Sequence, residues 1–385
     1  MQTIRFHAAI AELPAAAWDA LRRDSNPFVA HAFLHALEAN DCVRARWGWQ
    51  PHHLSIHDDG KLLAAAPLYL KTNSHGEYVF DFSWASAWQH AGGTYYPKLL
   101  NAVPYSPVPG PRLLAGDNAH TSALKVALVS AMRGEATRLG LSSVHADFLQ
   151  RDDLPAFVAD AAGHWLQRSD IQFHWHNHGY AHFPAFLATL AHKKRKNILR
   201  EREQVAASGL AIEWRDGHSL DADEWQRVHD LYAHTFDTKG NRATLTTGFF
   251  RSLGQLPLGT QLALARRDGV IVAMALFLRS DAVLYGRYWG AMVDQPGLHF
   301  ELCYYRGIAY AIAQQLDRFE PGAQGEHKLA RGFLPTRTHS RHYLANPAFR
   351  DAVAAALRQE SAAVDDYACV LTSHSPYALR EDVPT

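Results

Sequence analysis

The chain of 385 residues repeats one short pattern in the same context. Residues 59–66 read DGKLLAAA and residues 268–275 read DGVIVAMA, and each stretch follows a short apolar run. Two apolar strands joined by an Asp-Gly turn are typical of a β-hairpin. This repeat constrains the fold more than any other feature, because similar elements in a similar order indicate a duplicated structural unit.

The segments around the two hairpins match as well. Before each hairpin come two predicted helices, which contain LPAAAWDAL and FLHAL in the first copy and LDADEWQRV and FFRSL in the second. After each hairpin come a long predicted helix, at about 121–139 or 299–316, and a short strand. We therefore predict two α/β domains with mixed sheets, covering residues 1–172 and 173–385, with the two hairpins in equivalent places. The stretch 341–368 is expected to add a strand and a helix to the second domain.

Charge and cysteine content exclude some classes of protein. The chain has 38 Lys and Arg against 38 Asp and Glu, so contact with nucleic acid would require a local basic patch. Its three cysteines are widely spaced, which fits neither a disulfide framework nor a zinc site and indicates a reducing compartment. No apolar run approaches the ~20 residues of a membrane span. We expect a cytoplasmic protein without a signal peptide or membrane span.

Longer motifs resemble a known family. They are GEYVFDFSWA (76–85), YYPKLLNAVP (95–104), FHWHNHGY (173–180), YGRYWG (285–290), HFELCYY (299–305) and GAQGEHKLARGF (322–333). These stretches resemble the FemAB-like peptidoglycan biosynthesis/recognition family of predicted N-acyltransferases. The resemblance implies an α/β (α+β) fold of two tandem domains, similar to GCN5-related N-acetyltransferases (GNAT) and arranged as in the Fem aminoacyltransferases.

The same resemblance implies a reaction. An acyl or aminoacyl group would pass to the amine of a small molecule or peptide, such as a peptidoglycan precursor. The donor would be a co-substrate, acyl-CoA or aminoacyl-tRNA, with tRNA as carrier and no permanently bound cofactor. The R/Q-x-x-G-x-G/A loop that holds the pyrophosphate of acetyl-CoA in GNAT enzymes is missing from the sequence. The alternative is a non-catalytic protein that recognises a cell-wall precursor or a partner.

A basic helix is expected at about 184–207. Its apolar stripe of Leu187, Leu190, Ile198 and Val205 also carries Lys194 and Glu201, and buried charges require partners. We expect the helix at the domain junction with Lys194 facing inward. Either its cations bind phosphate or carboxylate, or they form a solvated face; the candidate binding residues are Lys193, Lys194, Arg195 and Lys196.

The segment GAQGEHKLARGF follows a predicted strand and supplies the candidate catalytic residues. Glu326 or His327 would accept a proton from an attacking amine, while Lys328 and Arg331 would hold an anionic group. The alternative is a surface turn shaped by glycines. Arg287 is expected on one strand face with Tyr285 and Trp289, either binding an anion or stacked for packing. We predict that Arg287 and residues 326–328 line one cleft, where two strands diverge.

Two further clusters leave alternatives open. Tyr95, Tyr96 and Lys98 form either an acceptor groove in the first domain or part of its core. The histidines of residues 174–178 share one strand face, but no carboxylate or cysteine completes a ligand set, so no metal site is predicted. Cys303 lies in an apolar helix and is expected to be a structural thiol.

Overall fold

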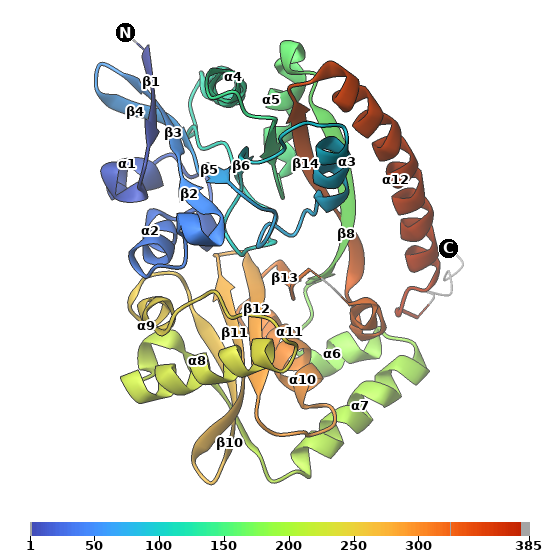
Figure 1. Cartoon of the computed structure of the whole chain (residues 1–385). Helices are drawn as coiled ribbons and strands as arrows, with labels where there is room; N and C mark the ends of the chain where they lie inside the picture. The colour runs from blue at the N-terminus through green and yellow to red at the C-terminus, as the bar shows by residue number, and fades with distance from the viewer. Residues whose placement is uncertain (1, 324, 379–385) are drawn as a thin grey trace. The chain divides into compact units, whose positions relative to one another are not determined.

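The computed structural model describes residues 2–323 and 325–378, which form two compact units (Figure 1). The first unit contains the chain up to Asp170 and Arg337–Asp366, and the second contains Ile171–Thr336 and the chain from Tyr367. The chain passes between the units within three elements: β8 (Leu166–His176), β14 (Leu334–Leu344) and α12 (Pro347–Ser373).

The first unit contains two sheets. One is antiparallel, with the order β1-β3-β4, and the other has the order β2-β5-β6-β7-β14-β8, in which β6 and β7 run parallel and β8 contributes its first residues, 166–170. The strands are β1 (Gln2–His7), β2 (Trp49–Pro51), β3 (His53–Asp58), β4 (Lys61–Ala66), β5 (Tyr69–Lys71), β6 (Lys98–Asn101) and β7 (Ser143–Ala146). The helices are α1 (Ala15–Asp19), α2 (His31–Ala39), α3 (Phe82–His90), α4 (Thr121–Arg138) and α5 (Leu154–Ala159).

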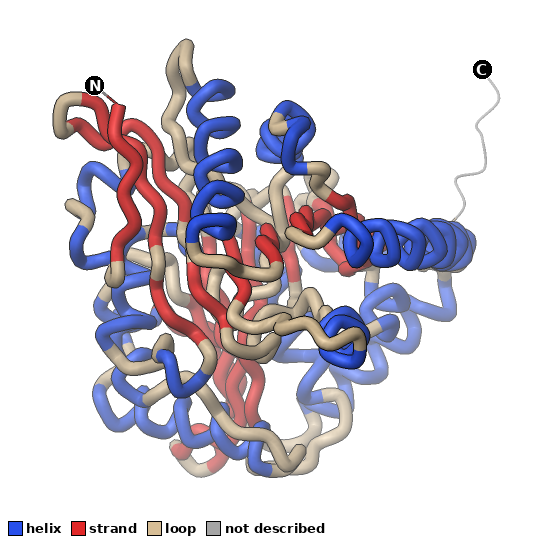
Figure 2. Tube along the Cα trace, turned by 45° about the horizontal axis from the view of Figure 1, so that its top comes forward, coloured by secondary structure: helices blue, strands red, loops and turns tan. Residues whose placement is uncertain are grey.

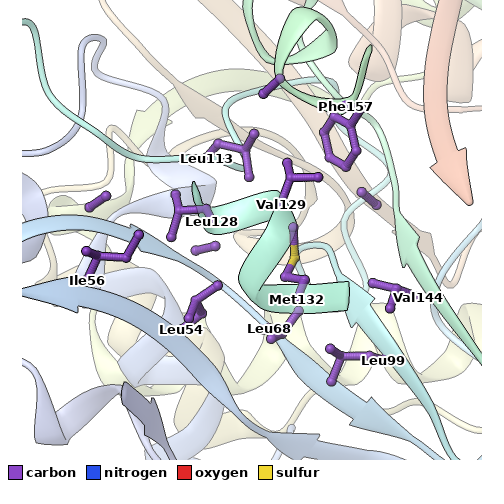
Figure 3. Close-up of a cluster of buried hydrophobic side chains, with 14 of the residues drawn as sticks. Leu54, Ile56, Leu68, Leu99, Leu113, Leu128, Val129, Met132, Val144 and Phe157 are labelled. Atoms are coloured by element: carbon purple, nitrogen blue, oxygen red, sulfur yellow. The ribbon is translucent and has the colours of Figure 1, made fainter. Parts of the chain in front are cut away.

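The core of the first unit forms around α4. Leu128 and Met132 of this helix are fully buried and belong to one apolar cluster with Leu54 of β3 and Leu99 of β6 (Figure 3). These side chains recur on α4 at the spacing that brings one helix face onto a sheet. The cluster joins the hairpin sheet to the β6–β7 sheet within the unit.

The second unit has one sheet, with the order β8-β13-β12-β11-β10-β9. All neighbours are antiparallel except β12 and β13, which run parallel. The strands besides β8 are β9 (Ala211–Asp216), β10 (Gln261–Arg267), β11 (Val270–Arg279), β12 (Val283–Ala291) and β13 (Arg318–Glu320). The helices are α6 (Phe183–Ala188), α7 (His192–Ala206), α8 (Ala222–Asp237), α9 (Thr247–Gln255), α10 (Leu298–Phe300) and α11 (Arg306–Ala313).

Several shorter elements complete the fold. Residues Glu301–Tyr305 form a π-helical turn that joins α10 to α11. The 3-10 turns are Ile10–Glu12, Pro27–Val29, Ala45–Trp47, Arg151–Asp153, Ala161–Gly163, Gly217–Ser219 and Glu326–Arg331. Helices and strands occur throughout the chain (Figure 2), as a mixed α/β fold requires.

The two predicted hairpins form and share their register. In β3–β4 the pairs next to the turn are Asp58↔Lys61, His57↔Leu62 and, after a bulge, Ile56↔Ala64. In β10–β11 they are Arg267↔Val270, Arg266↔Ile271 and, after a bulge, Ala265↔Ala273. Both turns have positive φ at Asp and Gly, as a type I′ turn requires. The first strand of each hairpin also pairs with a preceding strand, β1 or β9. Both predicted hairpins are therefore present with the same turn and bulge. Their sheets differ, because β3–β4 belongs to a three-stranded sheet, whereas β11 also pairs with β12.

Two sequence expectations differ from the structure. The basic helix expected at 184–207 is two helices, α6 and α7, because Leu190 between them pairs in extended conformation with Tyr377. The strand after residue 340 does not join the second unit. Residues Arg341–Leu344 of β14 pair antiparallel with β7, so this end of β14 belongs to the sheet of the first unit.

Candidate functional site

A pocket of about 250 Å³ lies in the second unit where β12 and β13 separate. The two strands pair only as far as Tyr285↔Glu320, after which β12 continues and the chain beyond β13 turns away at Pro321. The pocket is lined by Ala275, Leu276, Phe277, Gly286, Arg287, Tyr288, Trp289, His299, Cys303, Tyr304, Pro321, Gly322, Ala323, His327 and Lys328. Three of the four predicted cleft residues, Arg287, His327 and Lys328, therefore lie around one cavity.

A β-bulge shapes the β12 wall. Phe277 pairs with Gly286 and Leu276 with Tyr288, so Arg287 is an extra residue on β12. A bulge interrupts the alternation of faces along a strand. The expectation that Tyr285, Arg287 and Trp289 share one face is therefore wrong, because Tyr285 and Trp289 pair with Leu278 and Ala275, which lie on opposite faces. The bulge places Arg287 at the fork between the strands.

The helical wall contributes aromatic side chains. His299, Cys303 and Tyr304 come from α10 and the π-helical turn, and the ring of His299 lies 5.1 Å from that of Trp289. A π-helical turn inside a helix changes the direction of the side chains that follow it and is frequent at functional sites. Tyr304 Oη lies 2.8 Å from His327 Nε2, which ties this wall to the 3-10 turn of residues 326–331.

Gly325 makes room for His327. Its φ of +115° is strained for other residues, and a Cβ there would lie 2.4 Å from His327 Cε1. The imidazole can thus lie over the backbone at the rim of the pocket, where His327 is exposed to solvent. A glycine is therefore required at position 325, because any larger residue would displace the His327 ring.

The titratable groups of the pocket are shifted towards their neutral forms. Burial, with Arg331 and Lys328 nearby, lowers the pKa of His327 below its usual value. Burial lowers the pKa of Lys328 to about 8, while its Nζ donates a hydrogen bond of 2.6 Å to Gly322 O. Burial likewise lowers the pKa of His299 to about 4. Near neutral pH the site therefore offers a neutral imidazole that accepts protons and an ammonium group with a weakened hold on its proton.

Glu326 and Arg331 have different positions from those predicted. Glu326 is exposed and accepts a hydrogen bond of 2.6 Å from the hydroxyl of Tyr367, and it is not among the residues that line the pocket. Arg331 is buried and forms an ion pair of 2.8 Å with Glu201 of α7. The expectation that Glu201 requires a partner is confirmed. Arg331 holds the 3-10 turn against α7 instead of facing the pocket.

The basic residues of α7 lie apart from the residues that line this pocket. Lys194 and Arg195 are half-buried, whereas Lys193 and Lys196 are exposed. Ile198 on the predicted stripe is buried, and the half-buried position of Lys194 agrees with the helical phase. Binding by these four cations stays a prediction.

The first-unit cluster is largely core. Tyr95 and Lys98 are fully buried, and Lys98 Nζ lies 2.6 Å from Asp81 Oδ2 and 2.7 Å from Glu77 Oε2. Tyr96 is half-buried. Since the polar groups of Lys98 are satisfied internally, Tyr95 and Lys98 do not line an open groove, and the core alternative describes them.

Two residues near the pocket were missed by sequence reasoning. Tyr304 is part of the motif HFELCYY, but the sequence does not show that its hydroxyl contacts His327, because folding brings the two residues together. Glu320 is the buried acid that ends β13, and the apolar-strand pattern gave it no distinct signal. Among the described residues, no group of three or more His, Cys, Asp or Glu side chains is arranged to hold a metal ion. Within residues 2–323 and 325–378 no helix is long and apolar enough to cross a bilayer.

Comparison with known proteins gives a family and a fold. Residues 9–379 match the sequence model of the FemAB-like family, described as peptidoglycan biosynthesis/recognition. The chain is similar to the solved structure of FemX, with 11% identity, a TM-score of 0.53, and coverage of 92% of this chain and 100% of that chain. It is also similar to the C-terminal domain of a putative lysylphosphatidylglycerol synthetase from Agrobacterium fabrum, with 15% identity, a TM-score of 0.52, and coverage of 92% and 97%.

A conserved protein of unknown function from Bacteroides thetaiotaomicron gives a TM-score of 0.53 at 11% identity, over 89% of this chain and 100% of that chain. No curated protein matches the chain. At these identities the structural matches establish the fold alone. They confirm the mixed α/β fold of the Fem type expected from the sequence.

Proposed function

This chain belongs to the FemAB-like family, and we propose on that basis that it transfers an acyl or aminoacyl group to an amine. The observation that carries the proposal is the pocket at the fork of β12 and β13. It brings together His327, hydrogen-bonded to Tyr304, and the ammonium group of Lys328, whose pKa is lowered by burial. Acyl transfer requires a proton acceptor for the amine and a donor for the oxyanion, and these side chains supply both.

The proposed step is attack by a neutral amine on the carbonyl of an ester or thioester. A C–N bond forms, and collapse of the tetrahedral intermediate breaks the C–O or C–S bond of the donor. His327 accepts the proton from the attacking nitrogen and returns it to the leaving oxygen or sulfur. Lys328 donates a hydrogen bond to the carbonyl oxygen as it becomes negative, in a site where burial strengthens that interaction.

The donor that we favour is an aminoacyl ester such as aminoacyl-tRNA. Glu301 lies at the start of the helical segment that lines the pocket and forms ion pairs with Arg202 at 2.9 Å and Arg306 at 2.8 Å. The glycine-rich loop that holds the pyrophosphate of acetyl-CoA at a helix start in GNAT enzymes is missing from the sequence, which argues against acyl-CoA as the donor. Arg287 at the fork and the exposed Lys193 and Lys196 of α7 are proposed to contact anionic groups of the substrates.

The acceptor that we propose is a peptidoglycan precursor with an amine, encountered in the cytoplasm, where charged tRNA and acyl-CoA are made. The purified chain is incubated with such a peptide and with either acetyl-CoA or a mixture of charged tRNAs, and the products are analysed by mass spectrometry. Addition of an aminoacyl mass to the peptide, lost in His327→Ala, supports the proposal. Peptide binding without transfer from any donor would instead support the recognition protein.

A further inference from the structure

One buried carboxylate oxygen at the fork of β12 and β13 lacks a hydrogen-bond donor. Glu320 ends β13 and is 4% exposed. Its Oε1 accepts a hydrogen bond of 2.8 Å from Arg318 Nε, whereas Oε2 is buried without a hydrogen-bond partner among the described residues. Nε2 of His174 lies 4.0 Å from Oε2, beyond hydrogen-bond distance. Buried polar atoms are nearly always paired, so an unpaired one calls for an explanation.

The position of Glu320 relates it to the pocket. Its ladder partner is Tyr285, and the residues that follow each of them, Pro321 and Gly286, line the pocket. A Cβ on Gly286 would lie 3.1 Å from Pro321 Cα, so the two chains are still close where they begin to separate. The backbone of Glu320 therefore lies at the closed end of the fork, although Glu320 is not among the residues that line the pocket.

Glu320 and His327 approach the fork from different sides. Phe319 packs against Gly307 of α11, where a Cβ would lie 2.5 Å from the phenyl ring. Because alternate residues of a strand face opposite sides, Glu320 points away from α11. Tyr304, which holds His327, belongs to the helical segment on the α11 side. A donor on the helical side and an acceptor on the other side would meet in the gap between the strands.

Burial and the neighbouring arginines act on the Glu320 carboxyl in opposite directions. Burial raises the pKa of Glu320 to about 7, although Arg318 of its own strand and Arg287 of β12 oppose this shift. His174 of β8 contributes no charge near neutral pH, because burial lowers its pKa well below the usual value. The carboxyl group thus changes protonation near neutral pH, and an ammonium group is a guest whose N–H donors would satisfy Oε2.

We propose that Glu320 receives the ammonium group of the acceptor at Oε2 and removes its first proton. This inference rests on the proposed function and assigns the acceptor to the primary alkyl amines, which are protonated at neutral pH. The ammonium ion and the Glu320 carboxylate become a neutral amine and a carboxylic acid. The amine then forms the C–N bond with the donor carbonyl, the donor C–O or C–S bond breaks, and the second proton leaves through His327.

The test compares two acceptors on the full chain. A lysine-containing peptide is protonated at pH 7, whereas hydroxylamine is neutral and requires no first deprotonation. Glu320→Gln should lower kcat/KM for the peptide by about 100-fold or more and change that for hydroxylamine by less than about threefold. It should also remove the rise of peptide kcat/KM near pH 7, while Glu320→Asp keeps that rise at a lower rate. The matched control is Glu203→Gln on the exposed face of α7.

Equal losses with both acceptors would overturn the inference, because they would indicate a structural role. An unchanged pH profile in Glu320→Gln would overturn it as well, while leaving acyl transfer intact. If the wild-type chain acylates neither acceptor, the proposed function fails. The ammonium site is then tested separately, by the binding of methylammonium. The Glu320 carboxyl signal, identified by ¹³C NMR from its loss in Glu320→Gln, should titrate at lower pH when methylammonium is added. A titration unaffected by methylammonium contradicts the ammonium site.

Discussion

His327 Nε2 and the hydroxyl oxygen of Tyr304 lie 2.8 Å apart, so one of these two groups donates a hydrogen bond to the other. Burial raises the pKa of Tyr304, which keeps its hydroxyl protonated at neutral pH. When Nε2 donates to Tyr304 Oη, Nδ1 is the nitrogen that accepts a proton from substrate. The tyrosine therefore fixes the orientation of the imidazole, and the direction of this hydrogen bond decides which ring nitrogen can accept a proton.

Removing this hydroxyl should affect turnover more than binding. We expect Tyr304→Phe to lower kcat about tenfold with less than a twofold change in KM, because the phenyl ring keeps the packing while the imidazole loses its orientation. The rise of kcat with pH that reports His327 should also broaden or shift. Steady-state kinetics across pH 5–8 measures both effects. A KM change larger than the kcat change would place Tyr304 in substrate binding.

Lys328 should cost stability at neutral pH. Its folded pKa of about 8 lies below the usual 10.5, so the folded chain binds this proton more weakly than the unfolded chain. Stability therefore rises as the pH increases from about 8 to 10.5, and below this window the cost is about 3 kcal/mol at 1.4 kcal/mol per pKa unit. Lys328→Met should raise the free energy of unfolding at pH 7 and lower transfer.

Urea unfolding at pH 7 and pH 10 measures the effect of Lys328→Met. The stability gain should shrink at the higher pH, where the folded wild-type chain buries Lys328 in its neutral form. An exposed lysine, Lys61, provides the control, since Lys61→Met should leave the urea midpoint nearly unchanged. A loss of stability in Lys328→Met at pH 7 would show that the hydrogen bond to Gly322 O outweighs the burial of the ammonium group.

Lys98 should matter for folding, in contrast to Lys328. The Lys98→Met substitution leaves the carboxylates of Glu77 and Asp81 buried without their shared cation. Breaking such a buried pair typically costs about 3–5 kcal/mol. We expect a loss of this size in the urea-derived free energy of unfolding at pH 7. A change below about 1 kcal/mol would mean that Lys71, 3.8 Å from Glu77, compensates.

Gly325 should be sensitive to a single methyl group. Gly325→Ala places a Cβ against the His327 ring at a φ that favours glycine, so the ring must move. We expect kcat to fall more than tenfold while the far-UV circular dichroism stays unchanged. Gly240→Ala is the matched control, because Gly240 also has positive φ but a Cβ there meets nothing within 4 Å. Equal activity of the two variants would contradict a role for the His327 position.

Local chemistry explains which parts of the fold were predictable. The hairpins follow from their Asp-Gly turns, and the predicted helix that contains LDADEWQRV is α8, which the side chain of Asp221 caps. The break between α6 and α7 depends on a pairing of Leu190 with Tyr377, which no local pattern contains. The place of β14 likewise depends on a strand far earlier in the chain.

The site was predictable by region but not by side chain. Neighbouring residues of a 3-10 turn point about 120° apart, so His327 lines the pocket while Glu326 points to Tyr367. The bulge at Arg287 depends on the register with β11 and has no signal in β12 itself. Lys98 can be buried because its ammonium group pairs with Glu77 and Asp81, which lie in the segment between β5 and α3.

The pairing of β14 with β7 has a consequence for synthesis on the ribosome. When residues 143–146 have left the exit tunnel, the strand segment that will cover this edge, Arg341–Leu344, has yet to be translated. The edge of β7 is therefore open while the whole of the intervening polypeptide is made, and an open edge is a template for unwanted pairing. The amino-terminal half therefore completes its sheet only after residue 344 has been translated. Until then, the nascent chain exposes a strand edge to which chaperones can bind.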